Sequence, residues 1–65
     1  MHTFEFDHYY TLRIVGITEA LVNMNYIQSE LELATNARRH CFSDKRGRLF
    51  ECHDADIISF RKERP

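Results

Sequence analysis

The side chains best suited to chemistry are two His–Cys pairs in opposite order, His40-Cys41 and Cys52-His53. Imidazole nitrogens and thiolates are the ligands of structural zinc, and a tetrahedral site needs four of them. Neighbouring residues on a strand point to opposite faces, so one ion cannot readily use all four side chains. His40 and Cys52 alone are predicted to meet across a hairpin, and no third ligand accompanies them. We therefore expect no metal site.

The same pairs also supply a thiol and an imidazole, the parts of a nucleophilic enzyme site. Cys52 and His40 have neither a third orienting residue nor an oxyanion-binding turn beside them in the sequence. A Cys41–Cys52 disulfide would need a two-residue hairpin turn, and two cysteines are too few for a disulfide scaffold. No cofactor motif is recognisable. We expect no catalytic residue, no cofactor and no enzymatic activity.

Basic side chains offer a better binding prospect. Residues 38–65 hold eight Lys and Arg against five Asp and Glu, whereas residues 1–37 hold one against five, and the whole chain has a net charge of −1. If the fold brought the basic side chains together, they would follow a phosphate backbone, with tyrosine rings as stacking faces for bases. The candidate nucleic-acid residues are Arg38, Arg39, Lys45, Arg46, Arg48, Arg61 and Lys62. A solvated surface of mixed charge is the ordinary alternative.

Protein binding is the favoured class of function. Aromatic side chains beside arginines are typical of interface anchors, and the candidates are Phe4, Tyr9, Tyr10 and Tyr26. Residues 3–6 alternate in polarity and are predicted to form a short edge strand, which can accept a partner's strand or pair with a second copy. We expect a protein partner, with homodimerisation as one form of it. Nucleic acid is the alternative partner.

The elements that position these residues begin with one hairpin. Asp44-Lys45-Arg46-Gly47 suits a type I turn with the glycine in the left-handed region. A register that places apolar side chains opposite each other is preferred because such cross-strand pairs stabilise a sheet. This register predicts the following pairs: Asp44 with Arg48, Phe42 with Phe50, and His40 with Cys52.

A second hairpin is predicted upstream, with its turn at Asn36-Ala37. This turn would set Leu33 opposite His40 and Leu31 opposite Phe42. Leu31, Phe42 and Phe50 would then form one cross-strand row of apolar side chains.

The remaining segments also read as strands. Residues 9–15 place Tyr10, Leu12 and Ile14 on one face, residues 16–19 form a turn, and residues 20–26 alternate as Val22, Met24 and Tyr26 against asparagines. A bend at 53–56 leads to a final strand over 56–60. Residues 61–65 are predicted to be a frayed tail of a single domain that spans residues 1–65.

A helix competes with these strands. Thr18 would cap it, and apolar residues recur at helical spacing as far as Ala34, while Ser29–Glu32 fits a shorter start with a capping box. The strand interpretation is preferred because it pairs Leu31 with the two phenylalanines. The predicted fold class is mainly β, a small antiparallel SH3-like or Sm-like barrel or meander. The alternative is an α+β fold, ββαββ, with a helix within 18–38.

The order of strands (9–15, then Ala20 to Ser29, the hairpin at 44–47 and the closing strand at 56–60) resembles small SH3-like or Sm-like barrels. The layout is similar to that of the Rho-binding antiterminator type and, more loosely, to FlbD-type flagellar proteins. The similarity covers residues 9–60. The antiterminator type carries a helix before the barrel and a more acidic surface, whereas only eight residues precede the first strand here. The resemblance implies a non-enzymatic binding module and assigns no functional residue.

Length and composition set the remaining limits. A chain of 65 residues buries only about 60% of its unfolded surface, which leaves a small core. No basic-then-apolar leader and no apolar run near ~18 residues is present, so we expect a soluble, cytoplasmic protein that does not enter membranes. We predict a small regulatory or inhibitory module that binds another protein, of the kind that phages or plasmids encode.

Overall fold

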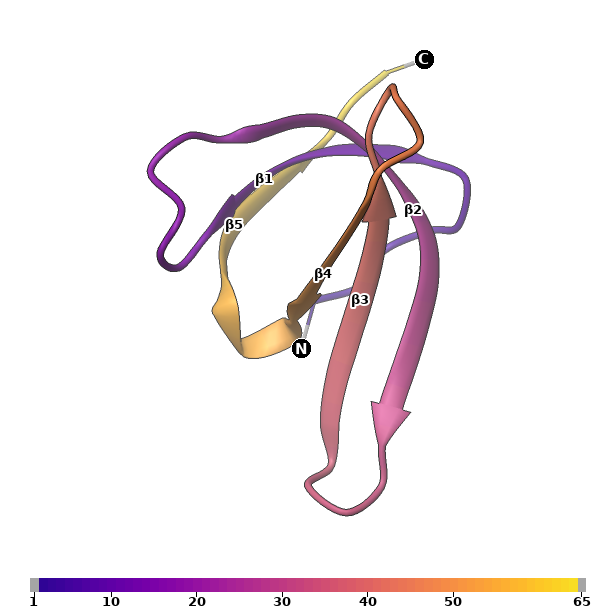
Figure 1. Cartoon of the computed structure of the whole chain (residues 1–65), viewed down its shortest axis with the longest axis vertical. Helices are drawn as coiled ribbons and strands as arrows, with labels where there is room; N and C mark the ends of the chain where they lie inside the picture. The colour runs from indigo at the N-terminus through magenta and orange to yellow at the C-terminus, as the bar shows by residue number, and fades with distance from the viewer. Residues whose placement is uncertain (1, 65) are drawn as a thin grey trace.

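The computed structural model describes residues 2–64, and its strands form one antiparallel sheet (Figure 1). The elements are β1 (Tyr9–Ile14), β2 (Leu21–Glu32), β3 (Ala37–Ser43), β4 (Leu49–His53), the 3-10 turn η1 (Asp54–Asp56) and β5 (Ile57–Lys62). The sheet order is β4-β3-β2-β1-β5. The mainly β prediction is confirmed. The alternative helix within 18–38 is wrong because β2 occupies most of that range.

The sheet curls but does not close into a barrel. Of the two forms predicted, a barrel or a meander, the structure has the meander. β4 and β5 remain as its two edges. The ring of Phe4 fills the concave face instead, with ring centroids 4.8 Å from Phe60 in β5 and 5.4 Å from Phe42 in β3. Side-chain packing, rather than backbone pairing between the edges, therefore completes the core.

The core gathers the inward-facing side chains of all five strands. Tyr10, Leu12 and Ile14 are buried together, as their alternation predicts. The other members of the buried cluster are Met24, Tyr26, Phe42, Cys52 and Ile57, and Phe4, Leu21 and Phe50 pack against it. Most of the hydrophobic stabilisation of this short chain comes from this one layer.

The hairpin of β3 and β4 has the predicted register, with Phe42 opposite Phe50 and His40 opposite Cys52. The Asp44 N–H donates to the Arg48 carbonyl at 3.0 Å, and Gly47 adopts a φ of 78°. A carboxylate oxygen of Asp44 also accepts the backbone N–H groups of residues 46 and 48, each at 2.9 Å. These local bonds fix the turn, which explains why sequence alone located it.

The register of the β2–β3 hairpin differs from the prediction. Leu31 pairs with Arg38, and Tyr26, not Leu31, lies opposite Phe42. The turn spans residues 33–36 with Asn36 in the left-handed region (φ 55°), and an irregularity between Tyr26 and Gln28 adds a further shift. The cross-strand row is therefore Tyr26–Phe42–Phe50.

A second irregularity changes the side on which Val22 lies. Between the pairs Tyr10–Met24 and Leu12–Leu21, β2 contains an additional residue, and Asn23 has a φ of 54°. Val22 is 62% exposed as a result, although the alternation predicted it on the same face as Met24. A bulge of this kind cannot be read from an alternating pattern.

Both ends of the chain also depart from the sequence prediction. Residues 3–6, predicted to be an edge strand, are irregular. Arg61 and Lys62, assigned to a frayed tail over 61–65, pair with β1, and the N–H of Glu63 donates to the Tyr9 carbonyl at 2.8 Å. The tail packs because β1 offers it a free backbone edge. Pro65 lies outside the described residues.

Candidate functional site

A chain of polar groups runs through the core at the concave face. His40 is only 1% exposed, and its two ring nitrogens lie 2.8 Å from the Tyr26 hydroxyl and 2.8 Å from a carboxylate oxygen of Asp54. The same Asp54 oxygen accepts the backbone N–H of His2 at 3.0 Å. Every ring nitrogen of His40 thus has a partner, as a buried polar group requires.

The protonation states of this network agree with a structural role. Burial, the largest influence, raises the pKa of Tyr26, so its hydroxyl stays protonated and is able to donate to Nδ1 of His40. Burial also acts to raise the pKa of Asp54, but hydrogen bonds from His40 and His2 outweigh it and hold the pKa below the usual 3.8. Nε2–H then donates to an ionised Asp54. The network therefore orders the core.

Sequence reasoning missed Asp54. Asp54 binds His40 of β3, which in turn binds Tyr26 of β2, and no spacing in the sequence links these positions to η1. The two predicted partner-binding tyrosines Tyr10 and Tyr26 belong to the core, with exposed fractions of 2% and 3%. They are therefore not available as interface anchors.

The two cysteines lie on opposite faces of the sheet. Cys52 pairs with His40 and faces the core, whereas Cys41 pairs with Glu51 and faces outward, and both thiols are free. Burial, with smaller contributions from Asp56 and Asp54, raises the pKa of Cys52 to about 11. A thiol with this pKa is a poor nucleophile near neutral pH. Within residues 2–64, no group of three or more His, Cys, Asp or Glu side chains is placed to hold a metal ion.

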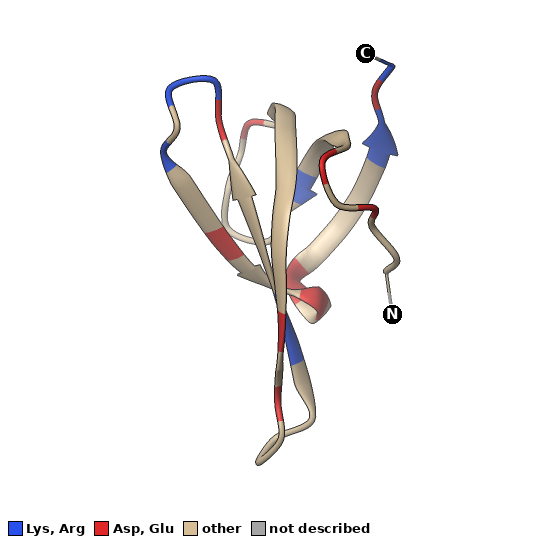
Figure 2. Ribbon diagram, turned by 90° about the vertical axis from the view of Figure 1, so that its right-hand side faces the viewer, with Lys and Arg blue, Asp and Glu red and all other residues tan. Residues whose placement is uncertain are grey.

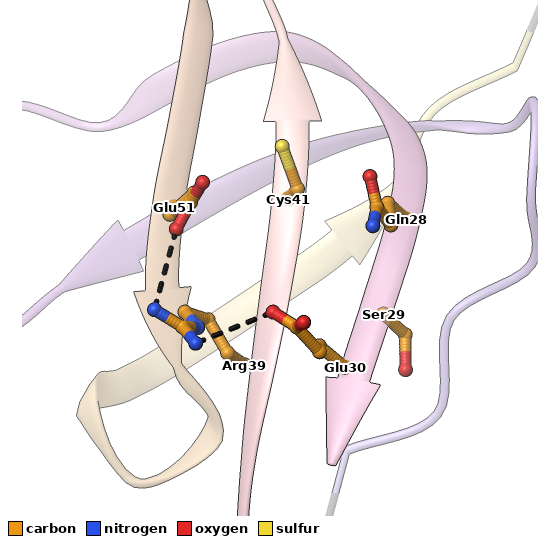
Figure 3. Close-up of a pocket in the computed structure, with 6 residues that line it drawn as sticks. All are labelled: Gln28, Ser29, Glu30, Arg39, Cys41 and Glu51. Carbon is orange, nitrogen blue, oxygen red and sulfur yellow. Dashed lines mark hydrogen bonds and ion pairs between the residues drawn. The ribbon is translucent and has the colours of Figure 1, made fainter. Parts of the chain in front are cut away.

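The convex face carries a ladder of ion pairs around Arg39 (Figure 3). The guanidinium of Arg39 lies 3.2 Å from Glu30 on β2 and 3.7 Å from Glu51 on β4. Cys41 and Gln28 line the small hollow beside it. Two carboxylates therefore compensate the charge of Arg39, one of the predicted nucleic-acid residues.

The other predicted nucleic-acid residues do not form one surface. Carboxylates pair with three of them: Asp44 with Arg48 at 2.9 Å, Glu63 with Arg61 at 3.0 Å, and Glu5 with Lys62. Arg38 lies at the start of β3, whereas Lys45 and Arg46 lie in the turn beyond its other end. Figure 2 shows Lys and Arg in separate places over the molecule. The fold therefore does not assemble the predicted basic cluster as a whole.

One smaller basic site does form. Tyr9, Asn23, Lys45 and Arg64 line a single hollow at the end where the β3–β4 turn and the C-terminus lie (Figure 1). Tyr9 is 44% exposed, and Lys45 and Arg64 have no carboxylate within 4.0 Å in the described part of the chain. Of the predicted stacking tyrosines, Tyr9 alone keeps an accessible ring among residues 2–64.

The edge strand β5 exposes apolar side chains. Its only buried residue is Ile57, while Ile58 is 62% exposed and Phe60 39% exposed. β5 pairs with β1 along one side, and within residues 2–64 no strand covers its other side. Phe4 touches Phe60 from the concave face and is itself half-buried. Of the four predicted partner-binding residues, Phe4 and Tyr9 remain partly accessible.

Comparisons with known proteins give no further guide. No protein-family model, curated protein or solved structure matches the chain. The resemblance to the Rho-binding antiterminator type therefore stays a prediction. No helix within residues 2–64 is long and apolar enough to cross a membrane.

Proposed function

We propose that this chain is a non-enzymatic regulatory module that binds another protein by accepting a strand along the β5 edge. The observation that carries the proposal is the exposure of apolar Ile58 and Phe60 on an edge strand. Native proteins usually protect such edges with charges, prolines or a covering element. Arg61 and Lys62 lie at the far end of β5, so Ile57–Phe60 remains unprotected.

Strand addition supplies affinity through backbone hydrogen bonds and specificity through alternate side chains. The β5 edge offers both unpaired backbone groups and exposed apolar side chains. A partner strand would pair with the free backbone groups of β5 and cover Ile58. A second copy of the chain would use the same groups, so homodimerisation is one form of this binding.

The test uses two matched lysine variants. Ile58→Lys places a charge on the edge, and Leu33→Lys places one at the β2–β3 turn, where Leu33 is 86% exposed. Proteins captured from a lysate on immobilised wild-type chain should also be captured by Leu33→Lys and should fall about tenfold or more on Ile58→Lys. Light scattering after gel filtration shows whether the partner is a second copy. Equal capture, or equal oligomerisation, by the two variants would contradict the β5 edge.

Single-stranded nucleic acid is the second candidate, because Tyr9, Lys45 and Arg64 line one hollow. A ring for base stacking beside unpaired cations is the usual arrangement for such ligands. Reversal of charge at Lys45 and Arg46 should weaken binding to single strands of any sequence and reduce its salt dependence. The matched control is Arg48→Glu, since Asp44 already pairs with Arg48. Binding that is insensitive to salt would exclude this candidate.

A further inference from the structure

A hollow on the concave side has no role in the proposed edge binding. It measures about 370 Å³, and its lining residues are His2, Thr3, Phe4, Phe6, Tyr26, Ser29, Arg38 and His40. None of these residues is acidic. The carboxylate of Asp54 is bound by His40 and His2, both of which line this hollow.

Arg38 is the unusual member of this lining. It is half-buried, and its Nη1 donates to the hydroxyl of Ser29, a neutral group. In the described part of the chain no carboxylate lies within 4.0 Å of it, whereas Arg39, Arg48 and Arg61 each have at least one. Removing a guanidinium from water is costly unless an anion compensates its charge. Among residues 2–64, Ser29 is the one group that accepts from its side chain, so its other N–H donors can bind such an anion in a bidentate manner.

Aromatic rings form the other side of the hollow. Phe6 is 61% exposed and stacks on Tyr26 with a centroid distance of 5.2 Å and an interplanar angle of 21°. Phe4 lies beside the same tyrosine at 5.1 Å. An exposed phenylalanine that is already part of a stack offers a flat apolar face to a further ring.

We propose that this hollow binds an anionic group attached to a flat apolar ring, namely an aryl phosphate or aryl carboxylate. The guanidinium of Arg38, positioned by Ser29, holds the anion in a bidentate contact. The ring lies against Phe6 and Phe4. His40 uses both ring nitrogens in the core network, so it supplies a wall and no hydrogen bond to the ligand.

The test is a titration of the ¹⁵N-labelled chain, followed in ¹H–¹⁵N correlation spectra. Phenyl phosphate and phenylacetate represent the two anions, and inorganic phosphate and phenol represent their separate halves. We expect an aryl anion to shift the amide signals of residues 4–6, 26–29 and 38–40, and to bind more tightly than either half. The aryl anion that binds more tightly identifies the acid group, phosphate or carboxylate, that the hollow prefers.

Variants distinguish this site from others. Arg38→Gln should weaken binding of the aryl anion about tenfold or more, whereas Arg39→Gln, next to it on the opposite face, should change it less than about twofold. Phe6→Ala should weaken binding of the aryl anion and leave inorganic phosphate unaffected. Ile58→Lys should leave binding of the aryl anion unchanged. The proposal for this hollow can therefore be wrong while the proposal for the β5 edge is right, and the reverse.

Several results would overturn the proposal. Equal effects of Arg38→Gln and Arg39→Gln would show a general charge effect, and shifts confined to residues 9, 45 and 64 would place the anion at the other hollow. Absence of any shift with both aryl anions would exclude the site. If Arg38→Gln does not fold, Arg38→Lys replaces it, because lysine keeps the positive charge and lacks the planar guanidinium. Wild-type affinity of Arg38→Lys for the aryl anion would contradict bidentate binding.

Discussion

At the scale of single residues, His40 has the most demanding environment in the described chain. Its ring is almost fully buried, and both nitrogens depend on side chains from other elements, Tyr26 and Asp54. A buried polar group that loses its partner keeps its desolvation cost. The stability of the core therefore depends on this network as well as on apolar packing.

Tyr26→Phe tests the network. The substitution removes one hydroxyl and leaves Nδ1 of His40 buried without a partner, so we expect the free energy of unfolding to fall by about 1–3 kcal/mol. Urea unfolding at 25 °C measures it. Tyr9→Phe is the control, because Tyr9 is exposed and its loss of a hydroxyl should change stability by less than about 0.5 kcal/mol. Equal losses of unfolding free energy in the two variants would show that the hydrogen bond between Tyr26 and His40 does not stabilise the fold.

The lowered pKa of Asp54 predicts how the free energy of unfolding depends on pH. Its pKa in the folded chain lies below the usual 3.8, because hydrogen bonds to the ionised carboxylate outweigh burial. The unfolded chain therefore binds a proton first as the pH falls. The contribution of Asp54 to stability should be complete above the unfolded pKa and should be lost as the pH falls through the lower, folded pKa.

Unfolding experiments between pH 2 and pH 7 provide the measurement. Asp54→Asn should flatten the slope below pH 4, with a residual slope from Glu5, Asp44 and Glu63, whose pKa values are also lowered. Asp56→Asn, in the same 3-10 turn, is the matched control and should keep the wild-type slope. A wild-type slope in Asp54→Asn would contradict the assignment.

At the scale of elements, the turns decide the register of each hairpin. The β3–β4 turn was predictable because Asp44 and Gly47 fit one known turn by local chemistry. The β2–β3 turn was not, because the left-handed residue is Asn36 and the loop is longer than the sequence suggested. The longer loop placed Leu31 opposite Arg38, and an extra residue near Ile27 then placed Tyr26 opposite Phe42. Period-two patterns do not show where such residues are inserted.

Gly47→Ala tests the predictable turn. A Cβ at this position would meet no atom within 4 Å, so the cost is conformational and arises from a φ of 78°. We expect a loss of about 1–2 kcal/mol in the free energy of unfolding. Gly47→Asn should recover part of it, since asparagine tolerates the left-handed region. Lys45→Ala in the same turn should be nearly neutral, and a comparable loss there would contradict the conformational explanation.

At the scale of the whole molecule, the N-terminal residues are part of the fold. Phe4 lies outside any strand, yet its ring contacts side chains of β1, β2, β3 and β5, and Glu5 N–H donates to the Tyr10 hydroxyl at 2.8 Å. An open sheet of five strands would otherwise expose its concave face. This packing takes the place of barrel closure.

Phe4→Ala should therefore destabilise the chain by about 2 kcal/mol, less than the loss for a fully buried phenylalanine because Phe4 is half-buried. Thermal or urea unfolding measures the change. Phe6→Ala is the matched control two residues away, and it should cost less than about 1 kcal/mol because Phe6 is 61% exposed. A larger loss for Phe6 than for Phe4 would contradict the proposed packing of the segment.

The sequence by itself determined β1, the β3–β4 hairpin and its turn, because alternation in β1 and the chemistry of Asp44 and Gly47 act over a few neighbouring residues. It also placed His40 opposite Cys52. Tertiary structure decided which residues meet over long distances. His40 joins Asp54 and Tyr26, Arg39 is neutralised between two strands, and Arg38 lines one hollow with aromatic rings of the N-terminal segment. These contacts depend on curvature, bulges and packing, which follow from the sum of many weak interactions across the whole chain.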